Sequence, residues 1–267
     1  ELQRMTATGG LRVGGSLGGS VTVDGVTALG SNTVLPVVSL VALNDDAQAV
    51  FSTAASTFNA LTARADNGVI VSVDVTSTVG AVYLDGDADD SSSADGVNIV
   101  TFAHNVTATA KAVMTLEASA GSIEAAGKLT LRAGTGIVIL DDMNGALADK
   151  ALVMHADFES AGDGVLTVWT GKTVTSSKSD VTITAWDVDL DGSLTSGTKT
   201  VSVHGAKVGQ TIGLGSTAKD MQIVQQMMDR YELDLALLKV LGTRTQTAKS
   251  EREARHAQGK DWINAGK

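Results

Sequence analysis

The sequence predicts an all-β fold, a parallel β-helix (β-solenoid) followed by a short C-terminal α-helical tail. Aromatic residues make up only 3% of the chain, which has 29 glycines and a single proline. A short alternating motif recurs before residue 215, and near residues 215–219 the composition and charge change. We therefore expect two regions, a parallel β-helix repeat region at 1–215 and a helical cap or tail at 216–267.

The recurring motif is an apolar residue, a spacer, a second apolar residue, a spacer and then a small residue. Alternation with a period of two places the apolar side chains on one face of a strand and the spacers on the other. Each copy therefore predicts a half-buried strand. The copies lie at 38–42, 82–86, 114–118, 129–133, 152–156, 181–185 and 201–205, with a looser copy at 166–170.

Short strands at near-regular spacing occur in sandwiches, barrels and solenoids. The small residue at the end of each copy favours a solenoid, because stacked coils turn sharp corners where only Ala or Gly fits inside. We expect roughly ten coils of about 20 residues around a narrow column that accommodates large aromatics poorly. In the segment 44–80, Phe51, Phe58 and Leu61 interrupt the alternation and predict a local bulge or a short helix.

The tail carries an apolar stripe at three- and four-residue steps, which predicts a helix at about 219–241. Thr217 and Asp220 have the spacing of a capping box at its start. A second charged stretch, 250–258, is also compatible with a helix. A cap over the last coil, a partner-binding helix and a junction unrelated to the repeats remain open alternatives. The stripe consists of Val224, Met227, Met228, Tyr231, Leu235 and Leu238.

Composition excludes several classes of protein. The formal net charge of −10 argues against nucleic acid as a partner, because a polyanion would be repelled. The absence of cysteine excludes disulfides, thiol catalysis and cysteine-ligated zinc. The longest apolar run, 34–43, is much shorter than the roughly 20 residues of a membrane-spanning helix, so we expect no membrane span.

Asp187, Asp189 and Asp191 precede a glycine and form the opening of a calcium-binding loop. The glutamate that completes an EF-hand at position 12 is replaced by Thr198. The three aspartates are the candidate metal ligands, with weak calcium binding as the hypothesis. The alternative interpretation is a row of outward, solubilising carboxylates.

A second acidic cluster lies in a serine-rich segment and predicts a hydrated insertion loop that provides a contact surface. It includes Asp85, Asp87, Asp89, Asp90 and Asp95.

Parallel β-helices also include enzymes that cleave polysaccharides, and such enzymes need paired carboxylates beside a cation or base. The sequence offers Asp141 and Asp142, with His204 and Lys207 on a later strand. Because neighbouring residues on a strand point to opposite faces, Asp141 and Asp142 would have to lie in a turn to converge.

The runs LEASAGSI at 116–123 and GKLTLRAGTGIVILDD at 127–142 resemble the repeats of filamentous-haemagglutinin-like proteins. These are very large surface proteins with parallel β-helical shafts. Residues 211–223 resemble a junction between long repeats, and residues 1–15 resemble the segment that comes directly after such a junction.

The resemblance implies an extracellular or cell-surface location and a structural or adhesive role without catalysis. It implies partners among cell-surface or matrix components, carbohydrate included, and neighbouring repeats of a longer array. It brings no catalytic residue, no cofactor and no cofactor-binding residue. We therefore expect a non-enzymatic segment of a large repetitive extracellular protein. The alternatives are a polysaccharide-cleaving β-helix enzyme and a calcium-stiffened scaffold.

Overall fold

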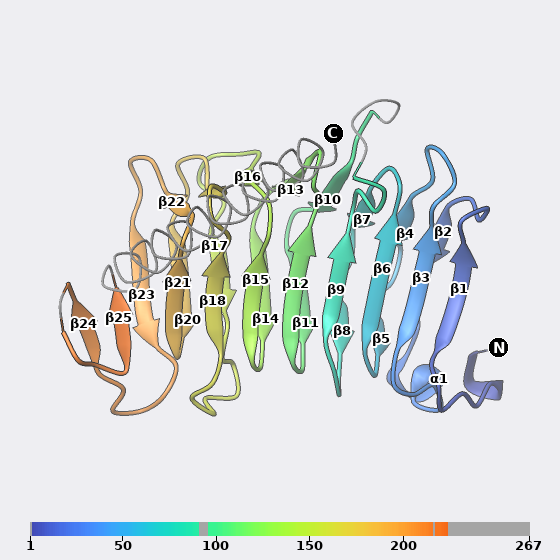
Figure 1. Cartoon of the computed structure of the whole chain (residues 1–267), viewed down its shortest axis with the longest axis horizontal. Coiled ribbons are helices and arrows are strands. Elements are labelled where there is room, and N and C mark those ends of the chain that lie inside the picture. The colour runs from blue at the N-terminus through green and yellow to red at the C-terminus, as the bar shows by residue number, and fades with distance from the viewer. Residues whose placement is uncertain (1, 91–95, 216, 224–267) are drawn as a thin grey trace, which may run out of the picture. The chain divides into compact units, whose positions relative to one another are not determined.

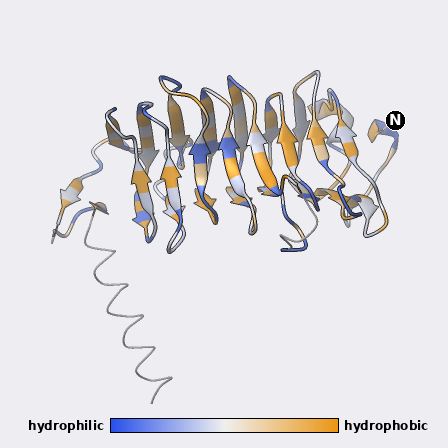
Figure 2. Ribbon diagram, turned by 90° about the horizontal axis from the view of Figure 1, so that it is seen from above, coloured by the Kyte–Doolittle hydropathy of each residue, from blue (hydrophilic) through white to orange (hydrophobic). Residues whose placement is uncertain are grey.

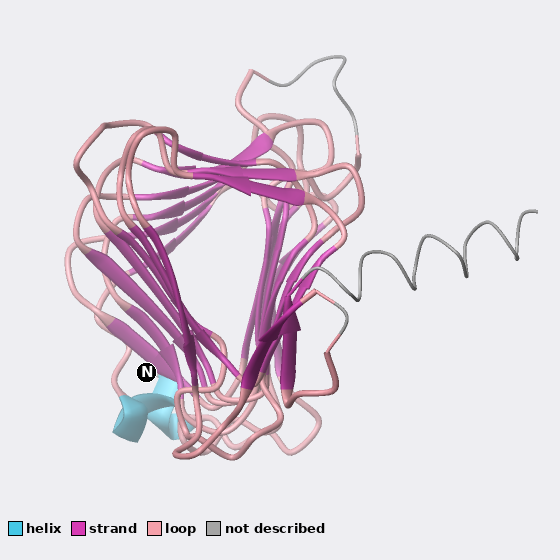
Figure 3. Ribbon diagram, turned by 90° about the vertical axis from the view of Figure 1, so that its left-hand side faces the viewer, coloured by secondary structure: helices cyan, strands magenta, loops and turns pink. Residues whose placement is uncertain are grey.

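The computed structural model describes residues 2–90, 96–215 and 217–223, and within them almost all regular structure is parallel β-strand (Figure 1). The fold is a parallel β-helix, as predicted. Three parallel sheets run along the stack and surround its interior (Figure 3). Buried apolar side chains from the three sheets form one core in that interior. The segment 224–267, which contains most of the predicted helical tail, lies outside the described residues.

Each coil contributes one strand to each sheet in turn, except that the first coil has no strand in sheet three. Sheet one contains β1 (Leu11–Gly15), β3 (Val38–Ala42), β6 (Leu61–Ala65), β9 (Val82–Asp85), β12 (Val113–Glu117), β15 (Gly136–Ile139), β18 (Val165–Val168) and β21 (Asp187–Leu190). Sheet two contains β2 (Val21–Val23), β4 (Ala49–Phe51), β7 (Val69–Val71), β10 (Ile99–Phe102), β13 (Ser122–Ala125), β16 (Met143–Gly145), β19 (Thr173–Thr175) and β22 (Ser193–Thr195).

Sheet three contains β5 (Ser56–Phe58), β8 (Val75–Ser77), β11 (Val106–Ala110), β14 (Leu129–Ala133), β17 (Leu152–His155), β20 (Val181–Ala185) and β23 (Val201–Gly205). At the start of the chain, a 3-10 helix η1 (Leu2–Arg4) packs on the short helix α1 (Ala28–Ser31), which contacts β5. After the last coil, β24 (Ile212–Leu214) pairs with β25 (Met221–Ile223) in a small separate sheet.

The core follows directly from the alternation in the sequence. In β14, Leu129, Leu131 and Ala133 are buried, whereas Thr130 and Arg132 lie on the outer face. Equivalent residues of neighbouring coils are aligned, as where Leu131 pairs with Ala108 and with Met154. Burying one apolar column in register therefore stabilises each coil through its two neighbours. Hydrophobic strand segments recur along the whole stack (Figure 2).

The number of coils differs from the prediction. Sheets one and two each have eight strands within the described residues, so the chain forms eight coils rather than about ten. In sheet one, register partners are 21 residues apart at Leu61 and Val82 but 32 apart at Val82 and Met114. The expected coil length of about 20 residues was too small. The recurring motif occurs in both sheet one and sheet three, so successive copies do not mark successive coils.

The segment 44–80 is regular, which corrects the expectation of a bulge or helix. It forms β4 to β8, and Phe51 and Phe58 are buried in the column together with Phe102. The column is thus wide enough for phenylalanine, while alanine fills other buried positions such as Ala49 and Ala63.

The predicted start of the tail helix was also wrong. Met221 to Ile223 form strand β25, and Met221 is fully buried. Asp220 caps no helix, because its Oδ2 accepts hydrogen bonds from the backbone N–H and the hydroxyl of Thr211 at 2.8 and 2.9 Å. The remaining predicted helical positions, from Val224 on, lie outside the described residues.

Candidate functional site

A group of hydrogen-bonded polar side chains lies on the outer face of sheet one, at the end of strands β6, β9 and β12. Arg64, Asp85 and Glu117 occupy the same position on these three strands, because the register pairs Arg64 with Asp85 and Asp85 with Glu117. Tyr83 lies two residues before Asp85, so its side chain is on the same outer face. We call Arg64, Tyr83, Asp85 and Glu117 the sheet-one cluster.

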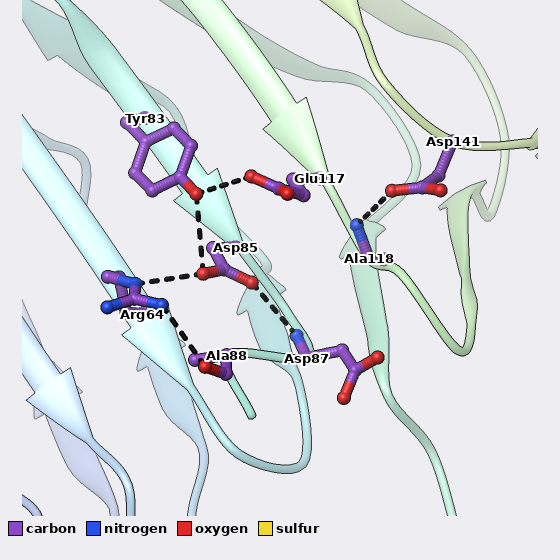
Figure 4. Close-up of polar contacts among 8 residues, drawn as sticks. All are labelled: Arg64, Tyr83, Asp85, Asp87, Ala88, Glu117, Ala118 and Asp141. Atoms are coloured by element: carbon purple, nitrogen blue, oxygen red, sulfur yellow. Dashed lines mark hydrogen bonds and ion pairs between the residues drawn. The ribbon is translucent and has the colours of Figure 1, made fainter. Parts of the chain in front are cut away.

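The sheet-one cluster is connected by hydrogen bonds across three coils (Figure 4). The Arg64 Nε donates to Asp85 Oδ2 at 2.9 Å, and Arg64 Nη2 donates to the Ala88 carbonyl at 3.1 Å. The Tyr83 hydroxyl contacts Asp85 Oδ2 at 3.4 Å and donates to Glu117 Oε2. The two carboxylates are thus bridged by one hydroxyl, and a guanidinium compensates the charge of Asp85.

Electrostatics fix the protonation states of Tyr83 and Arg64. Burial raises the pKa of the Tyr83 phenol far above its usual value, and its hydrogen bond to Glu117 and the charge of Asp85 raise it further. The hydrogen bond to Asp85 also raises the pKa of the Arg64 guanidinium. Tyr83 therefore remains a proton donor and Arg64 a cation at neutral pH. The Asp85 side chain is only 4% exposed, so a ligand would reach it only through rearrangement.

Buried aspartates next to this cluster bind backbone groups of the neighbouring coil. Asp141 Oδ2 accepts a hydrogen bond from the Ala118 N–H at 2.7 Å, and Asp141 Oδ1 pairs with Lys172 Nζ at 2.5 Å. Asp87 accepts from the Ala120 N–H. Each of these carboxylates accepts a hydrogen bond from a backbone N–H group that lies at a corner, outside the strand pairing.

The same contact recurs at other corners of the stack. A carboxylate accepts the backbone N–H of a residue one coil further along the chain, at distances between 2.7 and 3.1 Å. These pairs are Asp24 with Ala54, Asp74 with Thr107, Asp142 with Thr173 and Asp180 with Thr200. With Asp141 and Asp87, at least six of the 30 acidic residues thus bind backbone groups of a neighbouring coil.

The structure does not bring the predicted catalytic residues together. Asp141 and Asp142 lie in the turn between β15 and β16, as convergence would require, but Asp141 is buried and Asp142 exposed. His204 is on β23 in sheet three, paired with Thr184 of β20. The two aspartates follow sheet one, so the trio is divided between different faces of the β-helix.

The candidate calcium ligands Asp187 and Asp189 are on β21, and Asp191 follows it. Val188 between them is buried and Leu190 packs against the core, as expected for an outward row of carboxylates. Asp187 Oδ1 accepts from the Val188 N–H at 2.9 Å. Among the residues that the structure describes, no three His, Cys, Asp or Glu side chains are grouped closely enough to hold a metal ion. Calcium binding here stays a prediction.

The acidic segment after β9 differs from a fully hydrated loop. Asp85 and Asp87 are buried at its base, and only Asp89 and Asp90 are exposed among its described aspartates. Asp95 lies outside the described residues. The contact surface proposed from sequence therefore reduces to the exposed part of this loop.

Of the sheet-one cluster, the sequence singled out only Asp85, as part of the acidic segment, whereas Arg64, Tyr83 and Glu117 were missed. Arg64 and Asp85 are 21 residues apart, whereas Asp85 and Glu117 are 32 apart, so no fixed period aligns them. A polar residue at the end of successive copies of the strand motif was the available signal. Sequence reasoning also missed Trp169, which is 50% exposed at the corner after β18 and whose carbonyl accepts from the Lys172 N–H at 3.0 Å.

Comparison with known proteins adds no relative. No protein-family model matches the chain, and neither the curated proteins nor the solved structures contain a match. Among the described residues, no helix is both long and apolar enough to span a membrane.

Proposed function

We propose that this chain is a non-enzymatic structural or adhesive β-solenoid segment of a large repetitive extracellular protein. One observation carries the proposal: buried aspartates that could have served chemistry instead bind the backbone of a neighbouring coil. Asp141 does so with Ala118, and Asp87 does so with Ala120. A continuous apolar column with such corner bonds favours a rigid support for surface loops over a flexible catalytic cleft.

Attachment would use side chains that project from the corners. Trp169 is a large aromatic that is 50% exposed, and such side chains supply apolar contact area together with an N–H donor. Carbohydrate rings with apolar faces and hydroxyl edges match that chemistry. The net charge of −10 makes neutral cell-surface or matrix glycans the better candidates, because acidic glycans would be repelled.

Retention on immobilised neutral glycans tests this adhesive role. We expect the wild-type chain to be retained and Trp169→Ala to lose retention at least several-fold. Leu147→Ala is a matched control, since Leu147 is 52% exposed and lies outside this corner. Equal loss in both variants, or no retention of the wild type on any neutral glycan, would count against the proposal.

A second candidate function is polysaccharide cleavage, which the Tyr83 hydroxyl between Asp85 and Glu117 favours. Paired carboxylates are the machinery of glycoside hydrolysis. The burial of Asp85 and its pairing with Arg64 favour the structural role instead. Release of reducing ends from pectate and alginate distinguishes the two. We expect none, whereas release by the wild type that disappears in Glu117→Gln would establish the enzyme.

The third candidate is a scaffold stiffened by calcium at Asp187, Asp189 and Asp191. Because these side chains form no three-carboxylate group in the described structure, we expect the melting temperature to be the same in calcium and in chelator. A rise in calcium that is removed by Asp189→Asn would support the calcium scaffold.

A further inference from the structure

The outer face of sheet three carries no acid over four successive strands. On β11, β14, β17 and β20 buried and outward residues alternate, so eight outward side chains form two rows that cross the four strands. Five of the eight are threonine and none is acidic. We call these residues the sheet-three face. One row is Thr107, Thr130, Val153 and Thr182, and the other is Thr109, Arg132, His155 and Thr184.

Sheet one differs from this face in charge. Its outward residues include Glu117 on β12 and Asp187 and Asp189 on β21. The net charge of −10 is therefore not spread evenly over the β-helix. At about 0.15 M salt, exposed charges more than roughly 8 Å apart are largely screened. An anion at the sheet-three face would thus meet mainly the charges of that face.

Arg132 provides the positive charge in the middle of the sheet-three face. Its guanidinium carbon lies 4.7 Å from the centroid of the Phe158 ring, which holds the planar group against an aromatic surface. Among the described residues Arg132 forms no ion pair, whereas Arg64 on sheet one pairs with Asp85. No carboxylate of the described chain therefore occupies its N–H donors.

The loop between β17 and β18, which contains Phe158, holds three acids. Asp157 is fully buried, and its carboxylate accepts two backbone N–H groups of the same loop at 3.0 and 2.8 Å. Glu159 pairs with Lys111. Asp163 is exposed, and Lys207 reaches the same loop, where its Nζ donates to a backbone carbonyl at 3.4 Å. The two exposed acids of the loop are thus matched by two cations.

This chemistry fits a linear polysaccharide with a carboxylate on each sugar. A planar guanidinium binds a planar carboxylate through two parallel hydrogen bonds. Threonine hydroxyls donate and accept hydrogen bonds, as sugar hydroxyls do. Neighbouring strands lie about 4.7–4.9 Å apart, an interval similar to the length of one pyranose residue in an extended chain. Successive sugars would therefore meet successive coils.

We propose that the sheet-three face binds a polyuronate that lies along the stack of coils. Arg132 holds a carboxylate of this ligand, and Thr109 and Thr184 contact its hydroxyls. The site is separate from the corner of Trp169 and does not depend on the binding of neutral glycans. Local charge decides the ligand here, because this face lacks the acids that make the chain as a whole negative.

Isothermal titration of the full chain with polygalacturonate tests the proposal, at about 0.15 M salt and with chelator so that calcium does not bridge the carboxylates. We expect the wild type to bind this polymer and not its fully methyl-esterified form, which has the same rings without the charges. Arg132→Gln should weaken the affinity about ten-fold or more. Arg12→Gln is the matched control, because it removes the same charge from the outer face of sheet one and should leave the affinity unchanged.

Thr184→Glu provides a second test that keeps Arg132 and Phe158 intact. It places an acid in the row, and we expect a similar loss of affinity. Four results would overturn the inference: no binding by the wild type, equal binding of the esterified polymer or of dextran sulfate, equal losses in Arg12→Gln and Arg132→Gln, or wild-type affinity in a correctly folded Arg132→Gln. Retention on neutral glycans that persists despite such a result would leave the proposed adhesive function standing.

Discussion

Buried carboxylates at the corners connect one coil to the next, and Asp141 is the clearest case. Its side chain accepts the Ala118 N–H and pairs with Lys172, while the adjacent Asp142 is exposed and accepts the Thr173 N–H. A buried donor left without its acceptor costs about 1–3 kcal/mol, whereas loss of an exposed hydrogen bond costs less.

We therefore expect Asp141→Ala to lower the free energy of unfolding by about 1–3 kcal/mol. Asp141→Asn retains an acceptor oxygen for Ala118 and should lose less. Asp142→Ala is the neighbouring control, with an expected loss of about 1 kcal/mol or less. Urea unfolding followed by circular dichroism measures all three, and equal losses at Asp141 and Asp142 would contradict the role given to burial.

His155 couples stability to pH. Burial and the nearby charge of Arg132 lower its pKa below 6.5, and Asp157 only partly opposes them. Below pH 6.5 the unfolded chain therefore binds a proton that the folded chain resists, so this histidine makes stability fall as pH decreases. The fall ends below the folded-state pKa, where both states are protonated.

The urea midpoint of the wild type, measured between about pH 7.5 and about pH 5, should fall more than that of His155→Gln. The substitution removes the titrating group and leaves a side chain that can still form hydrogen bonds on the outer face of β17. Parallel pH profiles for the two proteins would show that His155 does not contribute.

At the scale of the element, the corners limit side-chain size. A Cβ atom on Gly121, just before β13, would lie 1.7 Å from the carbonyl oxygen of Asn98 on the preceding coil. A Cβ atom on Gly19 would have no atom within 4 Å. A side chain would therefore clash with the preceding coil at Gly121 but not at Gly19.

We expect Gly121→Ala to destabilise the protein by about 1–3 kcal/mol or more, since two coils must move apart to admit the methyl group. Gly19→Ala should change stability by less than about 0.5 kcal/mol. Thermal unfolding of both variants, followed by circular dichroism, gives the comparison. A neutral Gly121→Ala would mean that the corner can widen.

Strands with five alternating residues could be predicted from the sequence. The motifs at 129–133, 181–185 and 201–205 coincide with β14, β20 and β23, because alternation over five positions is enough to define two faces. The strands of sheet two could not be recognised in this way. Many have three residues, as in Met143–Gly145, and three positions carry too little periodicity to separate a strand from a turn.

The polar contacts were harder to predict than the strands. Asp85 and Asp141 were singled out for their acidity, but their partners Arg64 and Lys172 are 21 and 31 residues away. Only the register between coils of unequal length brings such pairs together. The sequence therefore indicated which carboxylates matter and left open whether they bind metal, substrate or backbone.

At the scale of the whole molecule, each coil contacts mainly its two neighbours, so whole coils are the natural units of change. Met114 and Ile137 are register partners. Deleting residues 114–136 should therefore remove one coil and keep the inward and outward faces in phase. A deletion of 114–125 removes only part of a coil, so the strands after the deletion no longer align with those before it.

We expect the 114–136 deletion to retain β-rich circular dichroism and one cooperative urea transition with a lower midpoint. The 114–125 deletion is expected to lose the transition or to be insoluble, because its apolar positions no longer align. Similar behaviour of both deletions would argue against independent, exchangeable coils.

The backbone hydrogen bonds of the three sheets run along the direction in which the coils are stacked, since every pairing joins one coil to the next. Tension applied along that direction would load these bonds one layer at a time. Under force, the protein should release whole coils from one end. A coil of 21 to 32 residues adds a contour length of about 70 to 115 Å, at roughly 3.3–3.6 Å per extended residue. A molecule that lengthens in such steps absorbs mechanical work while its remaining layers stay folded.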